Sequence, residues 1–325
     1  MGKKRKQTSS KLEFFYERLA TIVGRSFVQD IKKTFVEKPT TFRVNTLLST
    51  RKDVEELLKQ SGFTVRRVPW YSDAFILQNK SKRELMNHVL FEKGYIYVQS
   101  LASMVPPIVL NAKPGERVLD LTAAPGSKTS QIASYMEKTG ELVANDKDQV
   151  RFFKLEHNMK KLGVIDEEKE DWKFTLTNEP GERLCREYNE YFDKILLDAP
   201  CSAESRFIEG KPKTYSYWSE KKVEELARLQ RRLLKAAWSA LKPGGILVYS
   251  TCTMAPEENE LQISRFISEC EDEVTLLPIA IDGLRRLSLL KDWQEKGNSK
   301  KMKHMLRIMP TKDIEGFFIV KLQKA

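Results

Sequence analysis

The positions of apolar and polar residues divide the chain into two regions with different patterns. In the first region, apolar residues recur at helical spacing and then alternate with polar ones, as they do in short strands. The predicted elements are a helix over 11–36, a strand over 40–48, a capped helix over 49–62 and strands over 63–70 and 74–79. We therefore expect a small α+β domain over residues 11–92.

A regular alternation of strand and helix patterns begins near residue 95. The predicted strands are 117–121, 141–148, 172–178, 192–200, 246–253 and 317–323, and the predicted helices are 127–140, 150–163 and 221–245. This alternation indicates an α/β domain with a doubly wound, mostly parallel, Rossmann-like sheet. Such sheets bind ligands beyond the carboxyl ends of their strands. We place this domain over residues 93–325.

The composition supports a folded chain without a membrane span. A hydrophobic content of 41% is enough for a sizeable core, and no run of about 18 apolar residues is present. The first ten residues are basic, and no apolar run follows them, so they do not have the pattern of a secretory signal. We expect residues 1–10 to be a disordered basic tail.

Charge and cysteine usage narrow the class of protein. The net charge of +11 favours a polyanionic partner, of which a nucleic acid is the most obvious, although many intracellular proteins are mildly basic. The four cysteines form no Cys-x-x-Cys pair and there are three histidines, so we expect no metal site and no disulfide framework. We expect a cytoplasmic protein, or a nuclear or nucleolar one in a eukaryote.

The segment DLTAAPGSKT, residues 120–129, follows the first strand of the sheet and opens a helix. Its small residues let a ligand approach the backbone closely, and the new helix offers free N–H groups to an anion. It is neither a G-x-G-x-x-G motif nor a P-loop, because Ser127 separates Gly126 from Lys128. The alternative interpretation is an ordinary tight turn.

Asp146 ends the second strand, 26 residues after Asp120 and one β-α-β unit further along the chain. An acid at this place can accept hydrogen bonds from both hydroxyl groups of a ribose. Together with the 120–129 loop, it suggests a cofactor that contains adenosine. The alternative is that Asp146 and Asp148 only solvate a turn.

Two cysteines lie where strands end. Asp198 and Cys201 follow a buried strand in LLDAPCS, and Cys252 ends the next strand in YSTCT. Either cysteine alone is more readily explained by packing, and Asp198 by a cap. Two of the four cysteines at strand ends, one of them beside an acid, favour chemistry.

Two thiols and an acid beside an adenosine cofactor suit methyl transfer to carbon 5 of a pyrimidine. Addition of a thiolate to carbon 6, with protonation of the ring nitrogen, makes carbon 5 nucleophilic toward a sulfonium donor. A second thiol can assist release of the product. The attacking thiol needs a lowered pKa. The residues themselves leave open whether Cys201 or Cys252 attacks.

At these motifs the chain resembles the NOP/Sun (Fmu) family of RNA 5-methylcytosine methyltransferases, over roughly residues 41–323. DAPCS together with STCT is specific, because DNA cytosine methyltransferases carry only a Pro-Cys nucleophile. The other matching segments are FRVNTLL, YIYVQSLASMVPPIVL, DLTAAPGSKT, VANDKD, LQRRLLKAAWSALKPGGILVYSTCTMAPEENE and GFFIVKL.

The resemblance implies an enzyme that uses S-adenosylmethionine and assigns a role to each motif. The loop residues that would hold the methionine end of the cofactor are Thr122, Ala123, Ala124, Pro125, Gly126, Ser127 and Lys128. Asp146 would bind the ribose, supported by Arg151. Asp198, between cofactor and base, would protonate the ring nitrogen. Cys252 would be the nucleophile and Cys201 the release cysteine.

The chain departs from the family pattern in three places. Ser127 stands where the family usually has a second glycine, and DAPCS continues as AESRF without a glycine-containing turn. The third strand ends in TLTNEPG without the usual acid that contacts adenine, so Asn178 or Glu179 would replace it. Cys185 and Cys270 match no motif, and we expect both to be structural.

In this family the N-terminal domain and its tail would be the RNA platform. Candidate RNA contacts are Arg43, Arg66, Arg67 and Trp70, with a second basic cluster at Lys300, Lys301, Lys303 and Arg307. We expect tRNA or rRNA as the partner of a monomeric chain. For Glu257 and Glu258, a helix cap is the plainest explanation.

Two other functions stay open from the sequence. One is a DNA cytosine methyltransferase with Cys201 as the nucleophile. The other is a non-catalytic RNA-binding factor on a methyltransferase fold, which the altered end of the third strand permits.

Overall fold

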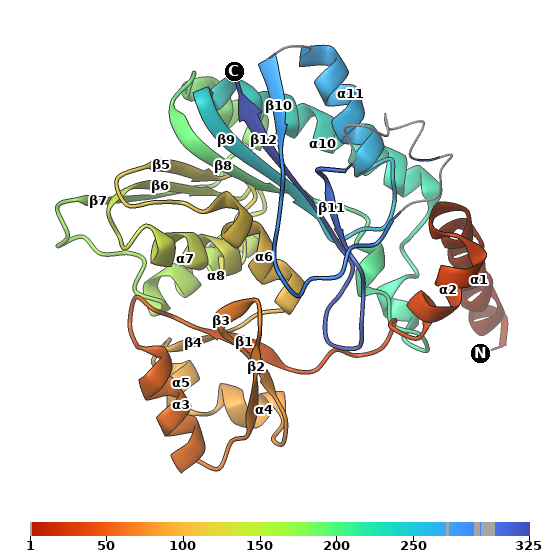
Figure 1. The fold of residues 1–325 in the computed structure, drawn as a ribbon, viewed down its shortest axis with the longest axis horizontal. Helices are drawn as coiled ribbons and strands as arrows, with labels where there is room; N and C mark the ends of the chain where they lie inside the picture. The colour runs from red at the N-terminus through yellow and green to blue at the C-terminus, as the bar shows by residue number, and fades with distance from the viewer. Residues whose placement is uncertain (1, 271–272, 289–292, 294–302) are drawn as a thin grey trace.

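The computed structural model describes residues 2–270, 273–288, 293 and 303–325, with the backbone alone for residues 2–10. Two sheets organise these residues, a small one near the N-terminus and a large one formed by the rest of the chain (Figure 1). No helix among the described residues is long and apolar enough to cross a membrane.

The small sheet is antiparallel, with strand order β2-β3-β1-β4. Its strands are β1 (Thr41–Val44), β2 (Val65–Val68), β3 (Tyr71–Leu77) and β4 (Ile96–Val98), and its helices are α3 (Arg51–Gln60), α4 (Lys82–Met86) and α5 (Val89–Glu92). The Thr50 hydroxyl caps α3 by accepting a hydrogen bond from the backbone N–H of Asp53. Because β4 pairs with β1, the small sheet extends beyond the expected boundary at residue 92.

The first two helices belong elsewhere. Helices α1 (Gly2–Val23) and α2 (Arg25–Lys32) pack against the segment that follows β8 (Phe192–Asp198), not against the small sheet (Figure 1). The Phe15 ring makes edge contacts with Phe207 at 4.9 Å and Trp218 at 5.5 Å between centroids. Residues 2–10, which we expected to be disordered, continue α1 as helix.

The large sheet has eight strands in the order β10-β12-β9-β8-β5-β6-β7, with β11 paired to β12. The strands are β5 (Arg117–Asp120), β6 (Gly140–Asn145), β7 (Trp172–Thr177), β8 (Phe192–Asp198), β9 (Leu241–Thr251), β10 (Val274–Leu277), β11 (Leu306–Ile308) and β12 (Phe317–Lys324). Strands β7, β6, β5, β8 and β9 are parallel. The predicted doubly wound sheet is therefore confirmed, and its order reverses between β5 and β8.

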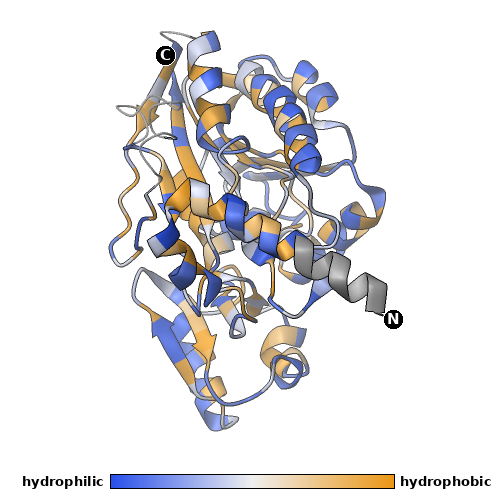
Figure 2. Cartoon of the chain, turned by 90° about the vertical axis from the view of Figure 1, so that its right-hand side faces the viewer, coloured by the Kyte–Doolittle hydropathy of each residue, from blue (hydrophilic) through white to orange (hydrophobic). Residues whose placement is uncertain are grey.

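Helices cover both faces of this sheet because successive strand residues point to opposite sides. Val118 packs in one core and its neighbour Leu119 in the other. Figure 2 shows these strands as mostly hydrophobic. The covering elements are α6 (Leu101–Leu110), α7 (Ser127–Tyr135), α8 (Gln149–Lys161), α9 (Gly181–Leu184), α10 (Glu220–Ala240) and α11 (Glu260–Cys270), with 3-10 turns η1 (Cys185–Glu187), η2 (Glu204–Arg206) and η3 (Pro212–Thr214).

Candidate active site

A cavity of about 440 Å³ lies at the carboxyl ends of β5, β6, β8 and β9, where the strand order reverses. This is the place at which a doubly wound sheet binds its ligands. The predicted residues that line it are Thr122, Ala123, Ala124, Pro125, Ser127, Lys128, Asp146, Arg151, Asp198, Cys201 and Cys252. One cavity thus brings together residues from every motif of the sequence.

Gly126 is the one predicted loop residue that does not line the cavity. It has φ +99°, a conformation that favours glycine, and a Cβ there would lie 2.4 Å from the Met159 methyl group. Gly126 therefore contributes to the site through the backbone, by letting the loop pack on α8.

One half of the cavity, which we call the cofactor half, is lined by the 120–129 loop and by Asp146 and Arg151. Hydrogen bonds between the loop and these two side chains fix its shape. The Ala124 N–H donates to Oδ2 of Asp146 at 3.2 Å. Arg151 Nη2 donates to the Ala124 carbonyl at 2.6 Å and lies 3.3 Å from Oδ2 of Asp146. The carboxylate of Asp146 is thereby fixed at the end of β6.

Asp120 supplies an unpaired acceptor in this half. Its Oδ2 accepts from the Thr129 hydroxyl at 2.7 Å, whereas its buried Oδ1 has no hydrogen-bond partner. Burial raises the pKa of Asp120 to about 7. A ligand ammonium group would satisfy the free oxygen. The residues present therefore fit S-adenosylmethionine, with Asp120 toward its amino end and Asp146 toward its ribose.

The end of the third strand differs from the expectation. Asn178 donates to the Asp146 carbonyl at 2.6 Å, and the Glu179 side chain lies 3.5 Å from Arg183. Neither side chain lines the cavity, whereas Gly181 and Glu182 of α9 do. The prediction that Asn178 or Glu179 replaces the adenine-contacting acid is therefore not supported, because both side chains are used elsewhere.

The two cysteines meet in the other half of the cavity. Strands β8 and β9 are neighbours with Asp198 opposite Ser250, so they end at the same level. The Sγ atoms of Cys201 and Cys252 are 3.4 Å apart. The hydrogen bond from Cys201, together with the charges of Arg206 and Lys128, lowers the pKa of Cys252 to about 7. The same hydrogen bond, with burial, raises the pKa of Cys201.

Asp198 lies beside the thiols, between the two halves. Its Oδ2 is 2.5 Å from Nζ of Lys128, and its Oδ1 accepts from the Ser250 hydroxyl at 2.7 Å. Lys128 also donates to the hydroxyl of Ser103 at 2.8 Å. The Lys128–Asp198 pair thus joins the loop of the cofactor half to the strands that carry the cysteines.

Two buried acids that we did not predict as site residues hold the cysteine loops. Glu258 accepts from the backbone N–H of Ser202 at 3.0 Å and from Gln230 Nε2 at 2.7 Å. Glu204 accepts from Thr253 Oγ1 and from the Met254 N–H, both at 3.0 Å. Glu258 is therefore not a helix cap, and burial raises its pKa to about 7.

The other glutamate of the predicted cap, Glu257, also has a role that the sequence did not indicate. Glu257 lies 2.6 Å from Arg18 of α1. Together with Glu220, which lies 2.9 Å from the same arginine, it ties α1 to the large domain.

The candidate RNA contacts separate into buried and exposed groups. Arg43 is 1% exposed and donates to Gln99 Oε1 at 3.0 Å and Ser130 Oγ at 2.6 Å. Arg307 is 3% exposed and lies 2.5 Å from Glu260. Neither side chain is available to RNA, so both predictions are wrong. They fail because these arginines pair inside the protein.

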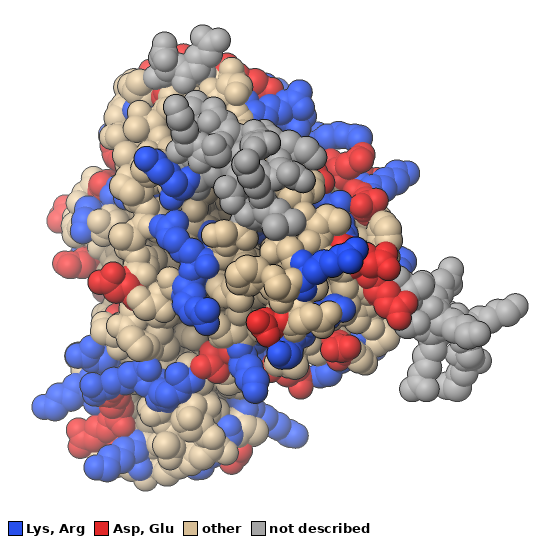
Figure 3. All heavy atoms as spheres, turned by 45° about the vertical axis from the view of Figure 1, so that its right-hand side comes forward, with Lys and Arg blue, Asp and Glu red and all other residues tan. Residues whose placement is uncertain are grey.

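The other basic candidates lie at the surface or outside the described residues. Arg66 pairs with Asp313 at 2.5 Å and Arg67 with Glu55 at 2.6 Å, and both arginines are at least half exposed. Trp70 is half-buried and Lys303 is exposed, while Lys300 and Lys301 lie outside the described residues. Figure 3 shows Lys and Arg side chains spread over this face of both domains.

A parallel sheet with this strand order, a small-residue loop after its first strand and an acid after its second are typical of Rossmann-like folds that bind an adenosine cofactor, S-adenosylmethionine-dependent methyltransferases among them. A family model described as 16S rRNA methyltransferase RsmB/F matches residues 107–323, and one for the N-terminal domain of 16S rRNA methyltransferase RsmF matches residues 13–101. The chain belongs to this family, as its resemblance to NOP/Sun enzymes predicted.

Several relatives are similar over most of this chain. A tRNA (cytosine(49)-C(5))-methyltransferase from Pyrococcus abyssi is 36% identical over 87% of this chain and 87% of its own length. Ribosomal RNA small subunit methyltransferase F from Vibrio vulnificus is 34% identical over 96% of this chain, which spans only 64% of that relative.

Two solved structures share the whole architecture. A methyltransferase homologue from Pyrococcus horikoshii has a TM-score of 0.78 at 32% identity and covers 96% of this chain and 95% of its own. NSun6 from the same organism, solved with SFG, has a TM-score of 0.78 at 26% identity over 95% of this chain and 97% of its own.

Proposed function

We propose that this chain transfers a methyl group from S-adenosylmethionine to carbon 5 of cytosine in RNA. The observation that carries the proposal is the pair of thiols 3.4 Å apart, at the ends of adjacent strands and in one cavity with Asp198. A covalent route needs a nucleophile, a proton donor and a group that assists release, and these residues supply all three.

Cys252 is the nucleophile in this proposal. Its lowered pKa makes the thiolate abundant near neutral pH. The thiolate donates an electron pair to carbon 6 of the ring, and the ring nitrogen gains a proton from the Lys128–Asp198 pair. The resulting enamine carries its electron density on carbon 5, which then takes the methyl group.

Cys201 assists release. Solvent water accepts the proton from carbon 5, the electron pair of that C–H bond re-forms the double bond between carbons 5 and 6, and the bond to Cys252 breaks with its electron pair left on the sulfur. Cys201 keeps its proton because its pKa is raised. It can therefore donate a hydrogen bond to the departing sulfur 3.4 Å away. The ring nitrogen returns its proton to Asp198.

The cofactor would be held by Asp146 at its ribose and by Asp120 and the 122–128 loop at its methionine end. When bound, S-adenosylmethionine supplies the methyl group as an electrophile. The protein's contribution is to fix the loop through Arg151 and Asp146 and to place Asp198 between donor and base.

We propose tRNA as the RNA class. The Pyrococcus relative named for tRNA is 36% identical to this chain, and the Vibrio relative named for ribosomal RNA is 34% identical. The small α+β domain is the proposed RNA platform, with Arg66, Arg67 and Trp70 as its surface candidates.

The direct test is incubation of the purified chain with S-adenosylmethionine and tRNA, ribosomal RNA or duplex DNA, followed by mass spectrometry of nucleosides. We expect 5-methylcytosine in tRNA and none with Cys252→Ala. Product in ribosomal RNA alone would overturn the RNA class. Product in duplex DNA alone, or in none of the three, would overturn the function.

A further inference from the structure

The segment after Cys201 departs from the family pattern, and it places an arginine in the cavity. Arg206 lines the cavity together with Cys201, Cys252 and Asp198, and its side chain is exposed to solvent. No ion pair or side-chain hydrogen bond satisfies this guanidinium among the residues that the structure describes. By contrast, the exposed Arg66 and Arg67 each have a carboxylate partner.

The backbone that carries Arg206 is fixed relative to Cys252. The N–H of Ser205 donates to the Cys252 carbonyl at 3.2 Å. Glu204, which is fully buried, binds Thr253 and Met254 of the Cys252 loop and accepts from Trp218 Nε1 at 2.7 Å. One carboxylate thus holds together the segment of Arg206 and the segment of Cys252.

The bond from Glu204 to Trp218 also fixes the neighbouring residue, Tyr217. Tyr217 is 53% exposed, and its hydroxyl lies 3.5 Å from the Ser202 carbonyl, one residue after Cys201. A second hydrogen-bonding group therefore lies beside the loop that carries Cys201 and leads to Arg206.

The proposed reaction indicates which part of the RNA lies near Arg206 and Tyr217. Carbon 6, the atom that Cys252 attacks, is bonded to the nitrogen that carries the ribose, which is not the ring nitrogen that Asp198 protonates. A phosphate of the target nucleotide therefore lies one sugar away from the reacting sulfur. Guanidinium and phenol groups are common donors to nucleic-acid phosphates, and a guanidinium matches phosphate geometry better than an ammonium does.

We propose that Arg206 and Tyr217 form a subsite for the phosphate of the target nucleotide, built on the 203–218 segment. This inference rests on the proposed function, because it takes RNA as the substrate. The subsite binds the backbone of the flipped nucleotide while the base enters the cavity. It positions carbon 6 over Cys252 without reading the sequence of the RNA.

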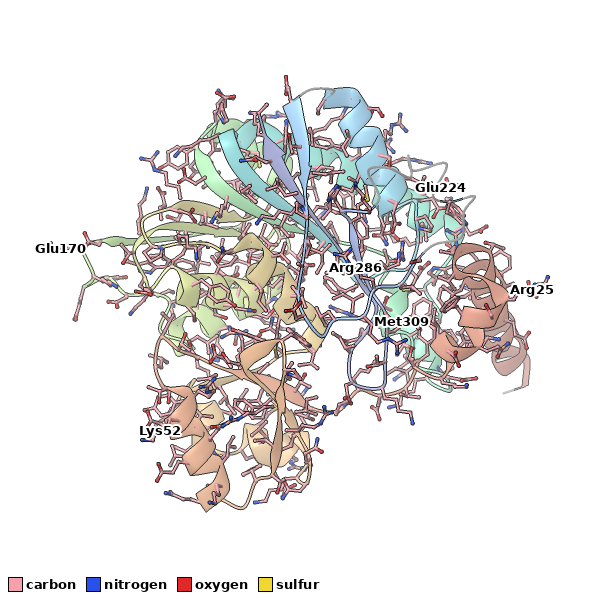
Figure 4. All side chains as sticks on the ribbon, viewed as in Figure 1. Arg25, Lys52, Glu170, Glu224, Arg286 and Met309 are labelled. Carbon is pink, nitrogen blue, oxygen red and sulfur yellow. The ribbon has the colours of Figure 1, made fainter. Side chains whose placement is uncertain are left out.

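The test is the salt dependence of RNA binding in full-length Cys252→Ala protein, which cannot form the adduct, with S-adenosylmethionine present. Affinity for a methylatable tRNA is measured at several KCl concentrations for Arg206→Met, Arg206→Lys, Tyr217→Phe and Arg25→Met. Arg25 is a matched control, because it is exposed on α2 and points away from the molecule (Figure 4).

Arg206→Met should reduce the slope of log affinity against log salt by about 0.7, the value for one phosphate contact on a single strand. Arg206→Lys should keep the slope of the parent. Tyr217→Phe should weaken RNA binding but leave the slope unchanged. Arg25→Met should match the parent in both affinity and slope. An unchanged slope in Arg206→Met with RNA still bound would overturn the subsite alone. If neither the Cys252→Ala parent nor any of the four variants bound RNA, the proposed function would be overturned as well.

Discussion

The two halves of the cavity are built in different ways. The cofactor half is local in sequence: Asp120 bonds Thr129, and Ala124 bonds Asp146. The substrate half joins distant segments, since Cys201 meets Cys252 and Glu204 meets Thr253. The 203–218 segment of this half also packs against α1, where Phe15 contacts Phe207. A local motif can bind the same cofactor in many enzymes, whereas an assembled half can change with the substrate.

The comparison predicts that damage in one half spares the other. Asp146→Ala removes the proposed acceptor for the ribose hydroxyls and should weaken S-adenosylmethionine binding by about tenfold to a hundredfold, as loss of charged hydrogen bonds does. Isothermal titration calorimetry measures this. RNA affinity should stay within about twofold, and substitution of the exposed Asp171 by alanine should leave both assays as in the parent. Equal loss of RNA binding would mean that the halves are coupled.

The converse change is Glu204→Ala. It leaves Thr253 Oγ1, Trp218 Nε1 and the Met254 N–H without their acceptor, so we expect a loss of about 1–3 kcal/mol in the free energy of unfolding. The Cys252 and Arg206 segments should also shift, which lowers kcat/KM for RNA by about tenfold.

Cofactor binding serves as the control for this variant. The dissociation constant of S-adenosylmethionine for Glu204→Ala, measured at a temperature where the protein is folded, should equal that of the parent. A tenfold weaker cofactor would refute the separation of the halves.

The pH dependence should be the smallest of these effects. In the proposed mechanism the thiolate of Cys252 reacts, and the pKa of this thiol is lowered to about 7, so kcat/KM for RNA should fall as pH drops below 7 and level off above it. The fall from pH 7.5 to pH 6.5 is about threefold. Steady-state rates in a constant-ionic-strength buffer give this profile. A level rate down to pH 6 would exclude a thiolate with this pKa.

The sequence predicted the cofactor half well because each motif there is continuous. DLTAAPGSKT follows a strand and opens a helix, and Asp146 ends the next strand, as expected. The meeting of Cys201 and Cys252 was also predictable, since both lie at strand ends. Their order in the sheet, with β8 beside β9, brings them together.

The rest depends on side-chain contacts between distant segments, which periodicity does not encode. Arg43 alternates in its strand like a surface residue, yet β1 lies inside the small sheet and this side chain bonds to Ser130 of α7. Glu258 looks like a helix cap but binds Ser202, far away in sequence. The packing of α1 on the 203–218 segment has no local signal, because its apolar stripe suits any partner surface.

The central claim is that Cys252 attacks and Cys201 releases. It is tested most directly by incubating Cys201→Ala, Cys252→Ala and the double variant with tRNA and S-adenosylmethionine, then separating the products on a denaturing gel. We predict a covalent protein–RNA adduct that accumulates in Cys201→Ala and is absent from the other two. An adduct that forms in Cys252→Ala and not in Cys201→Ala would reverse the roles and contradict this account.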